Sequence, residues 1–118
     1  MRKIYLAAPY SHPDHHVREL RTQQASRAAA QLMREGYCVF SPLSHSHPIA
    51  DHIGNHLEHD FWLNQCLPFV KWCDELWVLE LDGWEKSRGI QMEIEAAKSN
   101  GKGVFRWGYA IQLMEQGS

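Results

Sequence analysis

Several features that assign many proteins to a class are missing from this sequence. Its 118 residues contain no apolar run near the ~20 residues that a membrane helix needs. The short apolar start IYLAA is followed by polar Ser11, too soon for a signal peptide. The net charge of −2 gives no electrostatic reason to expect nucleic acid or an anionic membrane as a partner. We therefore expect a cytoplasmic protein that forms one domain over residues 1–118.

Motifs for cofactors and metals are missing as well. Neither GxGxxG nor GxxxxGK[ST] occurs, so the chain has no phosphate-binding loop of a known type. Cysteine is present three times, at Cys38, Cys66 and Cys73. An odd number without CxxC spacing indicates reduced thiols. His52, His56 and His59 have helical spacing, but without an HExxH pattern a surface helix is the simpler interpretation. We expect no cofactor and no metal.

The chain is organised around one stretch, DELWVLELDGWEKSRGIQMEIEAA, at residues 74–97. Its apolar run LWVLEL, broken by one Glu, is typical of a strand that a sheet buries on both faces. Asp82 and Gly83 then end the strand. Ser87 is a good N-cap for the helix that follows.

Glu93 occupies an unusual position in that helix. Ile90, Ile94 and Ala97 mark the buried face, and Glu93 falls on the same side. Glu95 points away from it and is expected to be a solvated surface charge. A carboxylate on an apolar face is either a boundary residue with its head in water or a group kept in a pocket for chemistry.

The rest of the chain alternates strands and helices. We predict strands at residues 3–8, 37–40 and 103–107, and helices at 15–35, 55–65 and 109–116. Residues 41–48 are predicted to form a connection before a helical turn at 49–53, and Pro68 is predicted to start a separate short turn. This βαβαβαβα order predicts an α/β fold with a flavodoxin-like or Rossmann-like parallel sheet of four or five strands. Tyr5, Phe40, Val78 and Phe105 should lie in those strands.

Ligands of such sheets bind beyond the carboxyl ends of the strands. Four loops should therefore meet there: residues 9–14, 41–47 and 82–87, and the turn near Trp107. Trp84 in the third loop is either a lid over a ligand or an oligomer contact. Asp82 is either a turn former before Gly83 or a group that protonates a substrate.

The segments IYLAAPYS, VFSPLSHSHPI and DGWEKSRGIQMEIEAA resemble the nucleoside 2-deoxyribosyltransferase-like superfamily. Within it, they are similar to the DUF1937 branch of small bacterial and phage proteins of unassigned function. The resemblance covers nearly the whole chain. It implies a small-molecule nucleoside or nucleotide as the partner of the protein.

The resemblance also implies roles for particular residues. Glu93, four residues after Gly89, matches the nucleophile, and Ser87 matches a residue that contacts the sugar. The remaining pocket residues are expected to be Tyr5, Ala8, Pro9, Tyr10, Ser41, Gly83 and Trp84. One position departs from the pattern: the transferases have an Asp where this chain has Cys66, and a thiol cannot replace a carboxylate toward the base. Asp60 or Asp82 are candidate substitutes.

Two functions remain open. The first is an enzyme that transfers or hydrolyses an N-glycosidic bond, with Glu93 capturing the oxocarbenium-like sugar and Asp82 assisting the base. Glu93, Ser87 and Gly89 favour it. The second is a non-catalytic nucleotide-binding module, a sensor or sponge for a nucleotide signal, which Cys66 favours.

The first testable prediction concerns assembly. A short chain encloses little pocket volume, and five Trp in 118 residues is a high content for a monomer. We expect a homodimer or larger, with the helix of Trp62 and Cys66 or the helix of Glu93 in the interface. Light scattering at micromolar concentration should give a mass of at least two chains, and a monomer would contradict the prediction.

Overall fold

The computed structural model describes residues 1–53 and 59–108. The elements there are β1 Lys3–Ala7, α1 His15–Arg34, β2 Cys38–Phe40, α2 Pro42–Ile53, α3 His59–Trp72, β3 Glu75–Leu79, the 3-10 turn η1 Trp84–Lys86, α4 Arg88–Ser99 and β4 Gly103–Trp107. The helix predicted at 109–116 lies outside the described residues, as does His56. In the part that is described, no helix is both long and apolar enough to cross a membrane.

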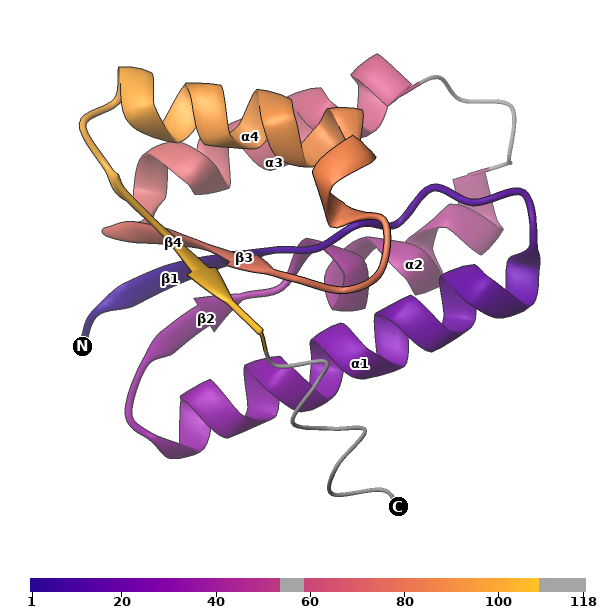
Figure 1. The fold of residues 1–118 in the computed structure, drawn as a ribbon, viewed down its shortest axis with the longest axis horizontal. Coiled ribbons are helices and arrows are strands. Elements are labelled where there is room, and N and C mark those ends of the chain that lie inside the picture. The colour runs from indigo at the N-terminus through magenta and orange to yellow at the C-terminus, as the bar shows by residue number, and fades with distance from the viewer. Residues whose placement is uncertain (54–58, 109–118) are drawn as a thin grey trace.

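The four strands form one parallel sheet in the order β2-β1-β3-β4 (Figure 1). The chain leaves β1 in one direction to reach β2 and returns to pair β3 on the other side of β1. The sheet therefore reverses its order between β1 and β3, and a crevice opens at their carboxyl ends. The predicted α/β fold and the strand positions of Tyr5, Phe40, Val78 and Phe105 are confirmed.

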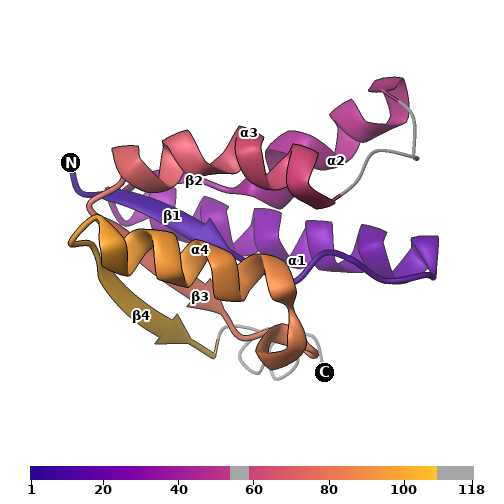
Figure 2. The same cartoon turned by 90° about the horizontal axis from the view of Figure 1, so that it is seen from above.

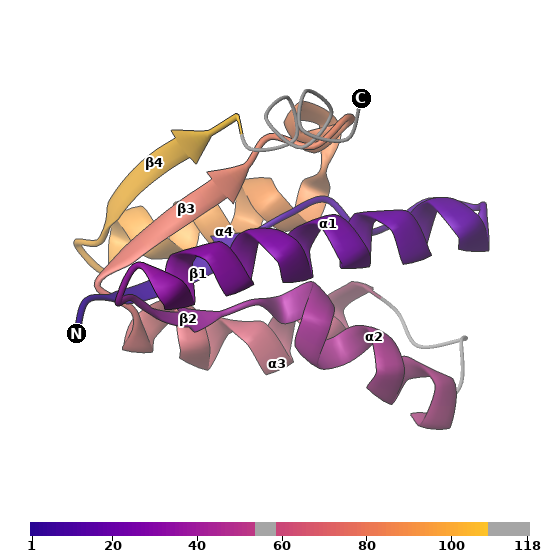
Figure 3. The same cartoon turned by 90° about the horizontal axis from the view of Figure 1, so that it is seen from below.

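Helices cover both faces of the sheet. α3 and α4 lie side by side on one face (Figure 2), and α1 crosses the other (Figure 3). β1 alternates between the two cores: Ile4 and Leu6 pack with α1, whereas Tyr5 and Ala7 pack with α3 and α4. All four side chains are fully buried. This alternation follows from the two-residue period of a strand, and it directs Tyr5 toward α4.

Two predictions about the helices are wrong. Residues 42–53 form one helix, α2, and α3 runs unbroken to Trp72 through Pro68. Pro42 is the first residue of α2, where its missing N–H costs nothing, and the Ser41 carbonyl accepts from the His45 amide at 3.0 Å. Pro68 has no N–H to donate to the carbonyl of Asn64, four residues earlier. Both residues are exposed, so water can bind that carbonyl instead.

α4 is fixed by its apolar face and by a cap. The Ser87 hydroxyl accepts from the Ile90 amide at 3.3 Å, as predicted for an N-cap. Ile90 and Ala97 are fully buried against the sheet. Glu93 lies between them, so the packing of Ile90 also sets the position of this carboxylate.

The second prediction tests that packing. Ile90→Ala should lower the free energy of unfolding by about 2–5 kcal/mol, because it removes buried methyl groups and leaves a cavity. Lys98→Ala on the exposed side of α4 is the matched control and should change stability by less than about 0.5 kcal/mol. Urea denaturation measures both, and equal effects would show that α4 does not anchor through Ile90.

Candidate functional site

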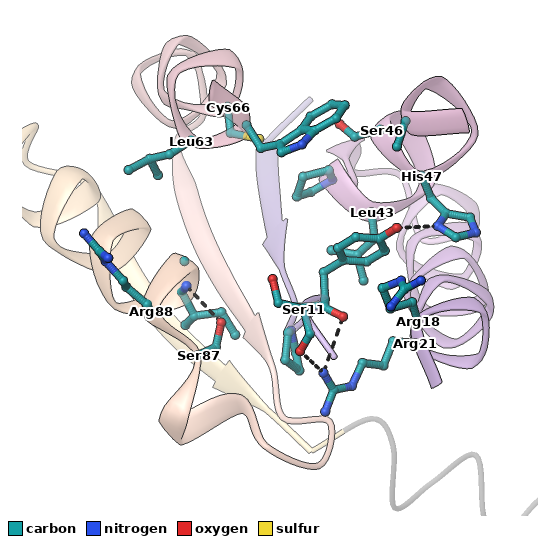
Figure 4. A pocket seen from close by; sticks show the side chains of 18 of the residues that line it. Ser11, Arg18, Arg21, Leu43, Ser46, His47, Leu63, Cys66, Ser87 and Arg88 are labelled. Carbon is teal, nitrogen blue, oxygen red and sulfur yellow. Dashed lines mark hydrogen bonds between the residues drawn. The ribbon is translucent and has the colours of Figure 1, made fainter. Parts of the chain in front are cut away.

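A cavity of about 1030 Å³ opens at the carboxyl ends of β1 and β3. The loop after β1, the first turns of α1, most of α2, the first half of α3 and the start of α4 form its walls. Figure 4 shows Leu63 and Cys66 of α3, Ser87 and Arg88 at the start of α4, and His47 of α2 around it. The cavity therefore lies where the strand order reverses, as expected for a ligand site in such a sheet.

Seven of the residues predicted for the site line this cavity: Ala8, Pro9, Tyr10, Gly83, Ser87, Gly89 and Glu93. They come from the loop after β1 and from the segment between β3 and α4. Tyr5 lies behind the wall and reaches the site through its hydroxyl, which donates a hydrogen bond to Glu93. The structure thus brings together residues from two of the three sequence segments that carried the prediction.

Glu93 is the buried carboxylate of the site. Only 7% of its surface is exposed, and its Oε2 accepts the hydrogen bond from Tyr5. Burial raises the pKa of Glu93 from 4.5 to about 7, and the Tyr5 bond opposes part of that rise. Glu93 therefore changes charge near neutral pH, which is a property of groups used in catalysis.

Cys66 joins this pair from α3. Burial raises the pKa of its thiol, and a hydrogen bond with the Tyr5 hydroxyl lowers it only in part. The pKa of Tyr5 is raised well above 10, first by burial and then by the charge of Glu93. Tyr5 and Cys66 therefore stay neutral at physiological pH, and Glu93 is the one member of this trio that ionises there.

Arg21 of α1 holds the two loops that form the floor of the cavity. Its guanidinium donates to the carbonyls of Ser11 and Asp82, each at 3.0 Å. Gly83 adopts a φ of +88°, and a Cβ at this residue would lie 3.0 Å from the Arg21 guanidinium. The left-handed backbone favours glycine here, and a side chain would also press on the Arg21 guanidinium.

Positive charge surrounds the opening. Four cationic residues line the cavity, against the carboxylates Asp51 and Glu93: Arg18, Arg21, Lys86 and Arg88. Within the described residues none of these four cations forms an ion pair with a carboxylate. A chain with a net charge of −2 thus concentrates unpaired positive charge at its cavity, an arrangement that attracts anions.

Three predicted residues lie away from the cavity wall. Asp82 is exposed and is held by its backbone carbonyl, so the structure does not bring its carboxylate to Glu93. Trp84 packs against the core under α4, with the Arg106 guanidinium 5.0 Å from its ring centre. Trp84 therefore packs within the protein and does not cover the cavity. Ser41 is buried, and its hydroxyl contacts the Ser44 hydroxyl at 2.9 Å.

Sequence reasoning placed residues 41–47 at this edge of the sheet as a loop, and it missed the helical wall that α2 forms there. The residues Leu43, His47 and Ala50 line the cavity with helical spacing. Proline is common as the first residue of a helix, so Pro42 could have been taken as a helix start. In such a helix these three residues share one face, because positions i, i+4 and i+7 lie on the same side. Among the described residues no cluster of three or more His, Cys, Asp or Glu could hold a metal ion.

Comparison with known structures defines the class of fold. The chain resembles a 2-deoxyribosyltransferase of the psychrotolerant bacterium Bacillus psychrosaccharolyticus, with a TM-score of 0.63 and 26% sequence identity. The likeness covers 88% of this chain and 70% of that one. The fold is therefore nucleoside 2-deoxyribosyltransferase-like.

Within that class, the chain belongs to the DUF1937 family, a domain of unknown function, whose family model matches residues 2–109. Comparison with curated protein sequences finds no match. The resemblance drawn from the sequence motifs is confirmed on both points, the fold and the family.

The third prediction follows from the pKa of Glu93. This pKa is higher in the folded chain, so the folded protein holds an extra proton between about pH 4.5 and about pH 7. The free energy of unfolding should fall as the pH rises through that window. Glu93→Gln cannot ionise, so its free energy of unfolding should rise relative to that of the parent by about 2.5 kcal/mol between about pH 5 and about pH 8.

Urea denaturation at the two pH values measures this gain. Glu95→Gln is the matched control, because Glu95 is exposed on the same helix. It should follow the parent at both pH values. A Glu93→Gln variant with the pH dependence of the parent would show that Glu93 titrates normally in the folded state.

Proposed function

We propose that the protein breaks the N-glycosidic bond of a deoxynucleoside or nucleotide and transfers the sugar to a second base or to water, with Glu93 as the nucleophile. The observation that carries the proposal is a buried carboxylate, contacted by a tyrosine, in the wall of a cavity at the strand-order reversal. The likeness to a 2-deoxyribosyltransferase supports the same reaction class.

The reaction would proceed in two steps. In the first, a Glu93 oxygen attacks the anomeric carbon as the carbon–nitrogen bond breaks, and the bonding electrons leave with the base. The product is a sugar ester of Glu93. In the second, a base nitrogen or a water oxygen attacks the same carbon, and the Glu93 carboxylate is released. Ser87 and Gly89 at the start of α4 would contact the sugar.

Tyr5 keeps Glu93 in place for this attack. Its hydroxyl bond fixes one carboxylate oxygen and lowers a pKa that burial alone would raise further. The attacking form is the anion, so the rate at limiting substrate should rise with pH through about 7. Burial of Glu93 is thus the common cause of its reactivity and of the pH dependence of the rate.

The fourth prediction tests the nucleophile. Glu93→Gln should lower base release by roughly 10³-fold or more, because an amide cannot form the ester. Base release is measured by chromatography with a panel of deoxynucleosides and their 5′-monophosphates. Glu95→Gln should keep the activity of the parent. Full activity in Glu93→Gln would exclude Glu93 as the nucleophile.

A non-catalytic nucleotide-binding module is the second candidate. Cys66 favours it, because a neutral thiol stands where the sequence resemblance implies an Asp near the base, and the structure leaves Asp82 outside the cavity. The unpaired cations around the opening suit a phosphorylated ligand in either case. The same panel decides between the two functions: bound nucleotide with no free base would favour the binding module.

A further inference from the structure

A chain of hydrogen bonds leads from the surface to the cavity on the side formed by α1 and α2. The Tyr10 hydroxyl lies 2.6 Å from His47 Nδ1, and His47 Nε2 lies 3.2 Å from a Glu19 carboxylate oxygen. Tyr10 follows β1, His47 belongs to α2 and Glu19 to α1. Three separate elements thus converge on one imidazole, whose position in the wall is seen in Figure 4.

The geometry of this chain suits a proton relay. The His47 side chain is only 13% exposed, and both of its ring nitrogens have partners. The bond from His47 lowers the pKa of Glu19, which stays ionised. An imidazole with a carboxylate on one nitrogen is held in a fixed orientation, so its other nitrogen can exchange a proton with a neighbouring hydroxyl. Tyr10 and His47 line the cavity, and the attack by Glu93 uses neither.

We propose that Tyr10 is the group that protonates the departing base, and that His47 and Glu19 are positioning residues that resupply its proton. This proposal rests on the proposed function and completes it. Tyr10 provides an acid for the base, a role that the Cys66 thiol does not fill. The carboxyl group of Asp82 lies outside the cavity and does not reach the base.

Protons move along this chain in opposite directions in the two steps. As the carbon–nitrogen bond breaks, the Tyr10 O–H gives its proton to a nitrogen of the base, and His47 Nδ1–H passes a proton to the Tyr10 oxygen. His47 becomes neutral and keeps its Nε2–H on Glu19. In the second step, the incoming base or water loses a proton, which returns through Tyr10 to His47. Nothing is oxidised or reduced, and Glu19 stays a carboxylate throughout.

The charges around Tyr10 are consistent with this role. Burial raises the pKa of the Tyr10 hydroxyl, and the Arg18 guanidinium lowers it in part, while Asp51 and Glu19 raise it. The hydroxyl therefore remains protonated and ready to donate at neutral pH. Arg18 stands beside the phenolate that forms for a moment during the transfer and stabilises it.

On the α1 side, His15 shares the Glu19 carboxylate, with its Nε2 3.4 Å from the oxygen that contacts His47. The groups that face the relay are thus His15 and Arg18 from α1 and Asp51 from α2. Asp51 is exposed to solvent, and all three residues line the cavity together with Tyr10.

The fifth prediction uses a leaving group that needs no acid. A purine deoxynucleoside methylated at N7 carries its positive charge already, so it departs without a proton. Tyr10→Phe should lower base release from unmethylated purine deoxynucleosides by about 10²-fold or more and change release from the N7-methylated one by less than about 3-fold. Chromatography of the free base measures both, with each compound also supplied as its 5′-monophosphate.

Two variants separate the relay from a loss of structure. Glu19→Gln should lower release of the unmethylated base by about 10-fold and spare the methylated substrate, because it acts on the proton and not on the fold. Tyr37→Phe is the matched control: Tyr37 lies next to β2 and packs with Trp77, away from the cavity. It should leave both rates unchanged.

The outcomes distinguish this proposal from the proposed function. Equal losses on both substrates in Tyr10→Phe, or no loss on either, would overturn the acid role while glycosidic cleavage by the parent stands. A parent that releases no base even from the N7-methylated compound would overturn the proposed function itself, and the acid role with it. A selective loss on the unmethylated substrate supports both.

Discussion

The contact between Tyr5 and Glu93 is the constraint on which the site depends, because it joins the central strand to the helix at the cavity. Tyr5 can reach α4 only because β1 alternates its side chains between two cores, which sends Ile4 and Leu6 to α1. A shift of one residue in the register of β1 would send Tyr5 to the wrong face. The catalytic hypothesis is therefore tied to the same pattern that builds the sheet.

Burial at this contact acts in two opposed ways. It raises the pKa of Glu93 to about 7, which lowers the stability of the folded chain once the group ionises. The same burial keeps water away from the carboxylate, which would leave it weakly solvated in its proposed role as a nucleophile. The hydrogen bond from Tyr5 stabilises the ionised form of Glu93 and so offsets part of the destabilisation that burial causes. A well-solvated carboxylate at this position would favour stability and offer little to the chemistry.

The sequence predicted the sheet and the position of Glu93 on the buried face of α4, because both depend on local periodicity. A strand buried on both faces and a helix with Ile90 and Ala97 on one side leave few alternatives for the residue between them. It failed where proline was read as a break: Pro42 starts α2, and Pro68 faces solvent within α3. It could not place Asp82 or Trp84, because the direction of a loop side chain depends on tertiary contacts, here Arg21 and Arg106.

The thiol of Cys66 has a physical consequence that a carboxylate there would reverse. A second carboxylate next to Glu93 would couple to it, and like charges at close range push one pKa up further. The neutral Cys66 thiol causes no such coupling, and the pKa of Glu93 is set by burial, which raises it, against the Tyr5 hydrogen bond, which lowers it. Under the proposed mechanism the proton for the base comes from another wall of the cavity, where His47 lies between Tyr10 and Glu19. In that proposal the nucleophile and the acid are separate groups in different environments, so each can have the pKa that its own step requires.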